Sequence, residues 1–507
     1  MRKRLLSLAA VAVVATACAG GATSSTGGYV QPPVPGHHQP TSPPRYPDPT
    51  PYDGVTFEDP GTNPVTDTDE DRVSTFAMDV DTASYTIAQR FVDDGNLPDP
   101  ASIRAEEWIN AFDQAYEAPR QDTFAINVDG ASTPFNGQGE VLLRVGIKAR
   151  ESSERKRPDT ALTFVIDTSG SMEREGRLEL VKDSLRKLVL SLDRADSIAV
   201  VAFSDDARVV LPPTRATDAE KILHAIDDLR PGGSTNLAGG LRLGYGLARE
   251  TLLGDGGIDR IVLASDGVAN VGLTDASGIL RQIRDDAAAG IELVSVGVGM
   301  GNSNDALLEQ LADQGDGFYA YINTLDEARR LFVEDLTSTL QTVALDAKVQ
   351  VRFDSDVVES YRLIGYENRA ISDDQFRDPG VDAGAIGAGH SVTALYALTL
   401  RDDAGGNGPL GTVALRWTEP DAKRESKLER QIDMGALAGR FEDADPTFRF
   451  DAIVAATAET LRGATSASGT DLHDIARVAR RVAEDLPETD QVHDFLRLID
   501  RMADLGG

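Results

Sequence analysis

The chain has 507 residues, of which 41% are hydrophobic, and this length predicts two or three globular domains rather than one core. Its formal net charge is −32 at pH 7, with 82 acidic and 50 basic side chains. Because binding to nucleic acid needs a basic surface, this charge balance argues against a nucleic-acid partner and favours solubility and cation binding.

The first 18 residues have the pattern of an export signal. Basic residues 2–4 precede an apolar run from Leu5 to Val14, and small residues then lead to Cys18. The apolar run is too short to span a membrane, so residues 1–18 are interpreted as a signal peptide. Cys18 is the only cysteine in the chain, which excludes an intrachain disulfide.

Two interpretations of Cys18 are open. In one, the signal is an ordinary secretory signal and the cysteine is incidental. In the other, the segment resembles a bacterial lipoprotein signal, which implies that Cys18 is lipidated and holds the protein on a membrane. Several acyl chains on one residue would anchor a protein stably, whereas a single chain gives only marginal binding. Ala19 is not an acidic retention residue, so the resemblance implies the outer membrane if the cell has one.

Composition and hydrophobic periodicity divide the chain into parts. We expect a signal peptide (1–18), a disordered tether rich in Pro, Gly and Ser (19–70), an N-terminal segment (71–125), strands of a flanking domain (126–158), a central α/β domain (159–340), a β-rich domain (341–440) and C-terminal helices (441–507). In the N-terminal segment, residues 74–85 predict a strand and then a helix capped by Asp81 or Thr82. Residues 104–112 predict another helix.

The central domain alternates predicted strands with predicted helices. This alternation predicts a doubly wound, mostly parallel sheet with helices on both faces. Ligands of such sheets bind outside the carboxyl ends of the strands, where the strand order reverses. The predicted strands are Leu162–Ile166, Ile198–Phe203, Arg208–Leu211, Ile261–Ser265, Ile291–Val296 and Gly317–Tyr321. The predicted helices are Leu178–Leu192, Asp218–Leu229, Leu237–Leu252, Ser277–Ala289 and Asp305–Asp313.

Strands are also predicted on both sides of the central domain. They fall at Phe124–Val128 and Val141–Ile147 before it, and at Lys348–Phe353, Ser360–Tyr366, His390–Leu400 and Gly411–Trp417 after it. Unpaired edges in either group would favour aggregation, so we expect both groups to form one β-sandwich into which the central domain is inserted. Three amphipathic helices are predicted to follow, at Phe448–Leu461, Leu472–Leu486 and Val492–Leu505.

Three predicted loops of the central domain carry oxygen ligands. The first predicted strand is followed by Asp167, Ser169 and Ser171, which alone would also fit an ordinary surface turn. A glycine-rich loop that opens a helix contains Thr235, and the fourth predicted strand is followed by Asp266. Carboxylates and hydroxyls without nitrogen or sulfur ligands suit a hard cation, Mg²⁺ before Ca²⁺.

This set of loops resembles the metal-ion-dependent adhesion site of von Willebrand factor A domains. The family pattern Asp-x-Ser-x-Ser, with a separate Thr and a separate Asp, falls on those five residues without a departure. The resemblance implies that they hold Mg²⁺, or Mn²⁺ or Ca²⁺, and that a Glu or Asp carboxylate of a protein partner completes the coordination. The sequences before and after the domain are similar to those of a family of bacterial surface proteins, including residues 361–369 and 387–390.

No enzyme motif competes with this interpretation. Gly-x-Ser-x-Gly and Walker loops are absent, and Gly297-Val298-Gly299 lacks the third glycine of a dinucleotide fingerprint, because Asn302 stands there. His390 is interpreted as a hydrogen-bonded structural residue rather than a catalytic one. We therefore expect a non-enzymatic, membrane-anchored adhesion protein of the cell envelope. The alternatives are a metal-assisted hydrolase, or a structural envelope protein with an unused metal site.

Overall fold

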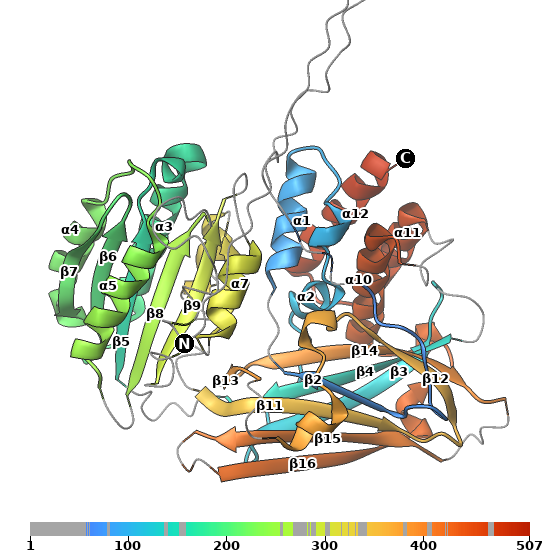
Figure 1. Ribbon diagram of the computed structural model, residues 1–507. Coiled ribbons are helices and arrows are strands. Elements are labelled where there is room, and N and C mark those ends of the chain that lie inside the picture. Colours follow the sequence, from blue (N-terminus) through green and yellow to red (C-terminus); the bar gives the residue numbers. More distant parts are fainter. Residues whose placement is uncertain are drawn as a thin grey trace, which may run out of the picture. The chain divides into compact units, whose positions relative to one another are not determined.

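The computed structural model describes residues 57, 59, 61–78, 82–135, 140–151, 159–253, 257–266, 281, 284, 290–299, 305–315, 317–322, 324–329, 331–332, 342–378, 383–402, 408–420, 422, 424–464 and 471–506. Figure 1 shows the arrangement of the helices and strands. The predicted signal peptide, including Cys18, lies outside the described residues. Within these residues, none of the helices is both long enough and apolar enough to cross a membrane.

The central domain is built on a six-stranded sheet in the order β10-β9-β8-β5-β6-β7. Neighbouring strands run parallel, except that β7 at the edge is antiparallel to β6. Every residue of β5 is buried, as expected for a central strand covered on both faces. The strands are β5 (Thr160–Asp167), β6 (Ser197–Phe203), β7 (Ala207–Arg215), β8 (Ile258–Ser265), β9 (Ile291–Val298) and β10 (Tyr319–Ile322).

Helices cover both faces of this sheet and create two separate hydrophobic cores. Residues of α3, α4 and α8 belong to one core, and residues of α5 and α7 belong to the other. The predicted doubly wound, mostly parallel fold is therefore confirmed, although the predicted helix at 277–289 lies almost entirely outside the described residues. The helices are α3 (Arg177–Ser191), α4 (Ala219–Asp227), α5 (Leu237–Glu250), α7 (Asp305–Asp313) and α8 (Leu325–Arg329).

The remaining strands form a sandwich of two mainly antiparallel sheets, seen below the helices in Figure 1. Sheet A has the order β1-β12-β14-β4-β3-β17, and sheet B has the order β13-β11-β15-β16 with β2 also paired to β11. Sheet A contains β1 (Thr66–Asp67), β3 (Phe124–Ser132), β4 (Glu140–Ala149), β12 (Val358–Ile364), β14 (Ser391–Leu400) and β17 (Leu437–Ala438). Sheet B contains β2 (Val73–Ala77), β11 (Thr342–Phe353), β13 (Ala385–Gly387), β15 (Pro409–Glu419) and β16 (Arg424–Asp433).

The central domain is inserted into this sandwich. Strand β4, which precedes the domain, pairs with β14, which follows it, from Lys148↔Ser391 to Glu140↔Thr399. Side chains of both sheets meet in one core, for example Val145 of sheet A and Val413 of sheet B. The prediction of one sandwich made from both strand groups is confirmed.

Several strands differ from their predicted extent. Strand β1 pairs with β12 through Thr66↔Tyr361, so the end of the segment that we expected to be a tether belongs to the sandwich. Strand β7 continues through Pro212 and Pro213, which an edge strand tolerates because it can leave N–H positions unpaired. Strand β16 was not predicted, because it is charged and only Ile432 within it is buried. Charged residues of this kind protect sheet edges from unwanted pairing.

Five helices outside the central domain share a second core with the outer face of sheet A. Trp108 of α2, Ile453 of α10 and Phe495 of α12 are all buried within it. The three predicted C-terminal helices are present. The helices are α1 (Ala83–Asp93), α2 (Ala105–Asn110), α10 (Pro446–Arg462), α11 (Leu472–Ala483) and α12 (Asp490–Gly506).

The N-terminus of α1 is satisfied by a distant side chain rather than by the predicted cap. Thr82 occupies the capping position, but its side chain makes no capping hydrogen bond, and Asp81 lies outside the described residues. Instead, Oε2 of Glu107 in α2 accepts the backbone N–H of Ser84 at 2.8 Å. The predicted cap by Thr82 is wrong, because a buried carboxylate from another helix takes the free N–H group.

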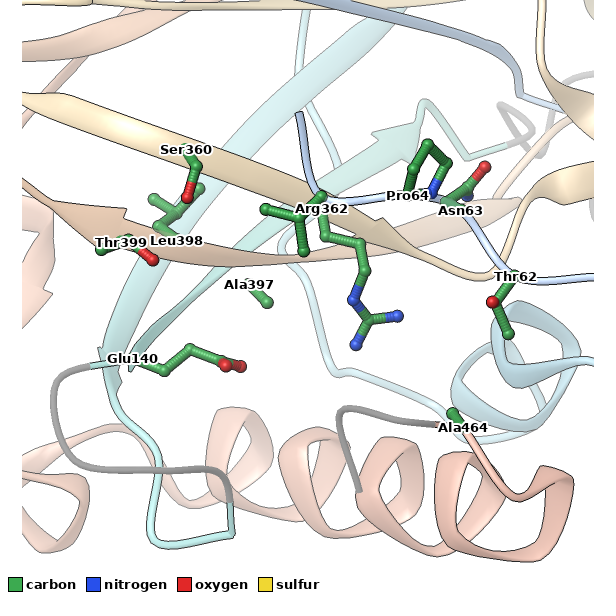
Figure 2. Close-up of a pocket in the computed structure, with 11 residues that line it drawn as sticks. Thr62, Asn63, Pro64, Glu140, Ser360, Arg362, Ala397, Leu398, Thr399 and Ala464 are labelled. Atoms are coloured by element: carbon green, nitrogen blue, oxygen red, sulfur yellow. The ribbon is translucent and has the colours of Figure 1, made fainter. Parts of the chain in front are cut away.

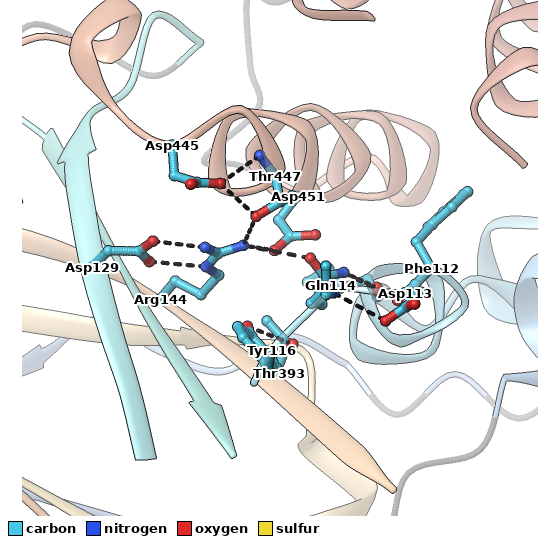
Figure 3. A network of polar contacts seen from close by, with 12 residues as sticks. Phe112, Asp113, Gln114, Tyr116, Asp129, Arg144, Thr393, Asp445, Thr447 and Asp451 are labelled. Atoms are coloured by element: carbon cyan, nitrogen blue, oxygen red, sulfur yellow. Dashed lines mark hydrogen bonds and ion pairs between the residues drawn. The ribbon is translucent and has the colours of Figure 1, made fainter. Parts of the chain in front are cut away.

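A buried arginine ties the C-terminal helices to the sandwich, as Figure 3 shows. Arg144 of β4 donates to Asp129 of β3 at 2.8 and 2.6 Å and to Oδ2 of Asp451 in α10 at 2.9 Å. Asp451 is fully buried, and burial raises the pKa of its carboxyl to about 7 although Arg144 lowers it. This cluster joins segments that are 307 residues apart in sequence.

Candidate functional site

The first loop of the candidate site follows β5 directly. Oδ1 of Asp167 accepts the backbone N–H of Ser169 at 2.7 Å, and its Oδ2 accepts the hydroxyl of Ser265 at the end of β8, also at 2.7 Å. The hydroxyls of Ser169 and Ser171 lie 3.0 Å apart. These contacts fix the loop so that its oxygens gather in one place.

The second loop, residues 232–235, is bonded to the first. The N–H of Gly170 donates to the carbonyl of Gly233 at 3.0 Å, and the N–H of Gly232 donates to the carbonyl of Thr168 at 2.7 Å. Gly233 has a φ of +84°, and a Cβ there would lie 2.7 Å from Oδ2 of Asp205. Both the backbone conformation and the space therefore require glycine.

The ends of this loop are held by polar groups. Oδ1 of Asp205 accepts the N–H of Ser234 at 2.9 Å, and the Asn236 side chain caps α5 by accepting the N–H of Gly239 at 3.0 Å. Thr235 lies between these anchors and is buried. Its hydroxyl oxygen has no hydrogen-bond partner among the described residues.

The third loop supplies Asp266, which directly follows β8 and is fully buried. Nη1 of Arg177, the first residue of α3, donates to its Oδ2 at 3.0 Å. The other oxygen, Oδ1, is buried and has no partner among the described residues. Because β5 and β8 are neighbours in the sheet, their carboxyl ends bring the three loops to one edge of the sheet, where the strand order reverses.

The two carboxylates of the candidate site, Asp167 and Asp266, are buried near each other. Burial raises the pKa of the Asp167 carboxyl to about 6, and the nearby charge of Asp266 adds to the rise. Hydroxyl and carboxylate oxygens are the ligands of hard cations such as Mg²⁺. The unpartnered oxygens of Thr235 and Asp266 are what a site built for an ion would leave, so the residues present fit a bound Mg²⁺. Such an ion would supply a Lewis-acidic position for an anionic ligand.

Sequence reasoning missed two participants, Ser265 and Arg177. Ser265 is the last residue of β8, and its sequence context indicates only a strand. Arg177 lies six residues beyond Ser171, where a basic residue at the start of a helix has no obvious role. Their partners come from other strands, so only the tertiary structure identifies them. Within the described part of the chain, no group of three or more His, Cys, Asp or Glu side chains has a metal-binding arrangement.

A pocket lies between the outer face of sheet A and the end of α10 (Figure 2), with a volume of about 370 Å³. Arg362 points into it from β12, and Glu140 approaches from the start of β4. The charge of Arg362 is already matched by Glu459 of α10 at 2.8 Å. No His, Cys or Lys lines this pocket, so its described lining offers no evident catalytic pair.

His390 has neither a catalytic partner nor the hydrogen bond that we expected. Its Nε2 is buried and has no partner among the described residues. The pKa of His390 is lowered to about 4, because burial disfavours the imidazolium and Lys148 repels it. The interpretation as a hydrogen-bonded residue is therefore wrong for this nitrogen.

Replacing His390 with Gln is expected to flatten the acid dependence of stability. Between pH 6.5 and 4, the unfolded chain binds a proton at His390 that the folded chain does not, so the free energy of unfolding decreases as the pH falls. Urea midpoints at pH 7 and pH 5 should differ less in His390→Gln than in the wild type. His224→Gln, which changes an exposed histidine, is the matched control. An unchanged pH dependence in His390→Gln would contradict this account.

Two family models match the N-terminal and central parts of the chain. Residues 161–338 match the family described as "von Willebrand factor type A domain", and residues 52–144 match the one described as "von Willebrand factor". The solved structure "von Willebrand factor type A from Catenulispora acidiphila" is 18% identical, with a TM-score of 0.42, over 74% of this chain and 89% of that chain. The family match at residues 161–338 makes the chain a von Willebrand factor A domain protein, a class often involved in protein interactions and adhesion.

The family can be stated more narrowly. Residues 338–505 match the family described as "Uncharacterized protein YfbK, C-terminal". The chain is 35% identical to YfbK of Escherichia coli (strain K12) over 463 residues, which cover 86% of this chain and 79% of that protein. It belongs to the YfbK family of bacterial von Willebrand A domain proteins. Human inter-alpha-trypsin inhibitor heavy chain H4 is 26% identical over 44% of this chain and 25% of its own length.

Proposed function

We propose that this protein is an envelope lipoprotein, not an enzyme, that binds a protein partner through Mg²⁺ held by its von Willebrand A domain. The residues that would hold the ion are Asp167, Ser169, Ser171, Thr235 and Asp266. The observation that carries the proposal is the pair of buried oxygens, on Thr235 and Asp266, that have no partner among the described residues.

The chemistry of the ligand set points to binding rather than to hydrolysis. Three of the five side chains are neutral hydroxyls, so a bound dication would keep much of its charge and attract an anionic ligand. A Glu or Asp carboxylate from a partner meets this requirement. Hydrolysis would in addition need a general base beside the site, and the two carboxylates of the proposed ligand set, Asp167 and Asp266, are already assigned to the ion.

Metal-dependent capture tests the proposal. The full chain is immobilised and exposed to an envelope extract in Mg²⁺ or in chelator, next to Asp167→Ala. A partner retained by the wild type only with Mg²⁺, and not by the variant, is the expected result. Hydrolytic turnover by the loaded protein would favour the metal-assisted hydrolase instead. Failure to bind Mg²⁺ at all would indicate an unused site.

Anchoring is tested separately through Cys18, which lies outside the described residues. If Cys18 is lipidated, Cys18→Ser should move the protein from the membrane fraction to the soluble envelope fraction, because the acyl chains supply the membrane affinity. Detergent phase partitioning of the two proteins measures this change. A variant that partitions with the detergent as the wild type does would contradict the lipoprotein assignment. The outer membrane is the location we propose for cells that have one.

A further inference from the structure

A buried guanidinium lies inside the candidate metal site. The pair formed by Arg177 and Asp266, 3.0 Å apart, is almost completely shielded from water, with side chains 3% and 0% exposed. Charges are seldom buried at such a depth unless they are paired. Arg177 therefore forms an ion pair with Asp266, one of the two carboxylates that are proposed as ligands of the cation.

The surrounding backbone leaves room for this arginine. Gly299, just after β9, has a φ of +72°, and a Cβ there would lie 2.2 Å from Nε and 2.7 Å from Cδ of Arg177. Any larger residue would displace the guanidinium. This requirement explains why residue 299 is glycine. In the sequence, Gly297-Val298-Gly299 resembled part of a dinucleotide fingerprint.

A second carboxylate is within reach of Arg177. Oε2 of Glu175 lies 3.9 Å from Nη2 of Arg177, while Oε1 of Glu175 lies 3.3 Å from Arg90 of α1. Glu175 has a φ of +53° and is followed by Gly176 with a φ of +72°. These two left-handed residues reverse the chain and bring the Glu175 carboxylate back towards the start of α3. Its side chain is 47% exposed, so water also solvates it.

We propose that Arg177 is the counter-ion of the metal-free site, an inference that rests on the proposed Mg²⁺ site. Without metal, the guanidinium neutralises Asp266. When a divalent cation binds, its positive charge repels the guanidinium of Arg177. Glu175 then becomes the principal counter-charge of Arg177. The arginine thus stabilises the metal-free domain and lowers its affinity for Mg²⁺. Because Glu175 also binds Arg90, the N-terminal helix α1 is linked to this exchange.

Calorimetry with Mg²⁺ alone on the full chain tests the inference. Arg177→Gln should bind Mg²⁺ about tenfold more tightly than the wild type, because the ion no longer competes with a cation for Asp266. In chelator, the same variant should melt about 5 °C lower, because Asp266 is left buried without its partner. Arg186→Gln is the matched control, because it removes a partly exposed arginine of the same helix that lies outside the site.

Glu175→Gln should act in the opposite direction. It removes an alternative partner of Arg177, so Mg²⁺ affinity should fall, whereas the melting temperature in chelator should change little. Equal or weaker Mg²⁺ binding by Arg177→Gln would overturn the inference, as would an unchanged melting temperature in chelator. If the wild type itself binds no Mg²⁺, the proposed function fails, and the chelator melts still decide whether Arg177 neutralises Asp266. If Arg177→Gln folds only with Mg²⁺, that dependence supports the counter-ion role.

Discussion

Asp167→Asn is expected to lose Mg²⁺ binding and to keep its fold. The amide can still accept the hydrogen bond from Ser169 or Ser265, but it lacks the charge that a hard cation needs. Asp167→Ala should lose Mg²⁺ as well and should be the less stable of the two, because it also lacks the acceptor atoms. Calorimetry with Mg²⁺ and thermal melts in chelator measure the two effects. Wild-type Mg²⁺ affinity in either variant would mean that the site is misassigned.

Asp167 should also make the stability of the metal-free wild type depend on pH. Because the pKa of Asp167 is raised to about 6, the folded metal-free protein binds a proton there between about pH 4 and pH 6 that the unfolded chain does not. The stability associated with this group is therefore complete below pH 4 and is lost as the pH rises through 6. Its upper limit is about 3 kcal/mol, since each pKa unit corresponds to about 1.4 kcal/mol.

In chelator, wild-type stability should fall more steeply than that of Asp167→Asn between pH 4 and 6. Mg²⁺ affinity of the wild type should weaken below about pH 6, because the ion must then displace a proton. Asp228→Asn, which removes the charge of an exposed carboxylate outside the site, is a control for general charge effects. Identical pH profiles for wild type and Asp167→Asn would show that Asp167 is not the titrating group.

Replacing Arg144 with Met is expected to cost about 3–5 kcal/mol of stability, because it leaves Asp451 fully buried without its cation. The loss should be smaller at low pH, where the carboxyl can take up a proton and become neutral. Urea unfolding at pH 5 and pH 8 provides the measurement. An unfolded variant at pH 8 that folds at pH 5 would also support this account.

Arg440→Met is the matched control for this change. Arg440 pairs with Asp443 at 2.7 Å, but both side chains are mostly exposed, so its loss should change the stability much less than the loss of Arg144. Equal losses of unfolding free energy in Arg144→Met and Arg440→Met would show that burial does not determine the loss. Asp451→Asn should be milder than Arg144→Met, because Asp129 still pairs with the arginine.

Two loops of the candidate site could be predicted from sequence because each carries a carboxylate next to a strongly apolar strand. The carboxyl ends of neighbouring parallel strands meet, so the sequence pattern alone is enough to place Asp167 and Asp266 together. Arg177 could not be placed in this way, since its partner is 89 residues away in sequence. Strand β16 could not be predicted either, because an exposed edge strand has few apolar residues.

The same limit applies to Arg144. Its strand has the expected apolar neighbours, and an arginine in such a strand normally faces solvent. The buried position depends on α10, which the chain reaches only after the whole central domain. Local patterns thus predict strands, helices and loops, whereas buried charge pairs depend on long-range packing.

The inserted arrangement of the sandwich also affects how the protein is made. Strands β3 and β4 are synthesised before the central domain, but β4 pairs with β14, which follows it. Residues as distant as Thr68 and Val358, 290 apart, must meet before the sandwich is complete. Contacts of such long range form slowly. During synthesis, the early strands therefore remain with an apolar face uncovered, so this segment is where binding by a chaperone would matter most.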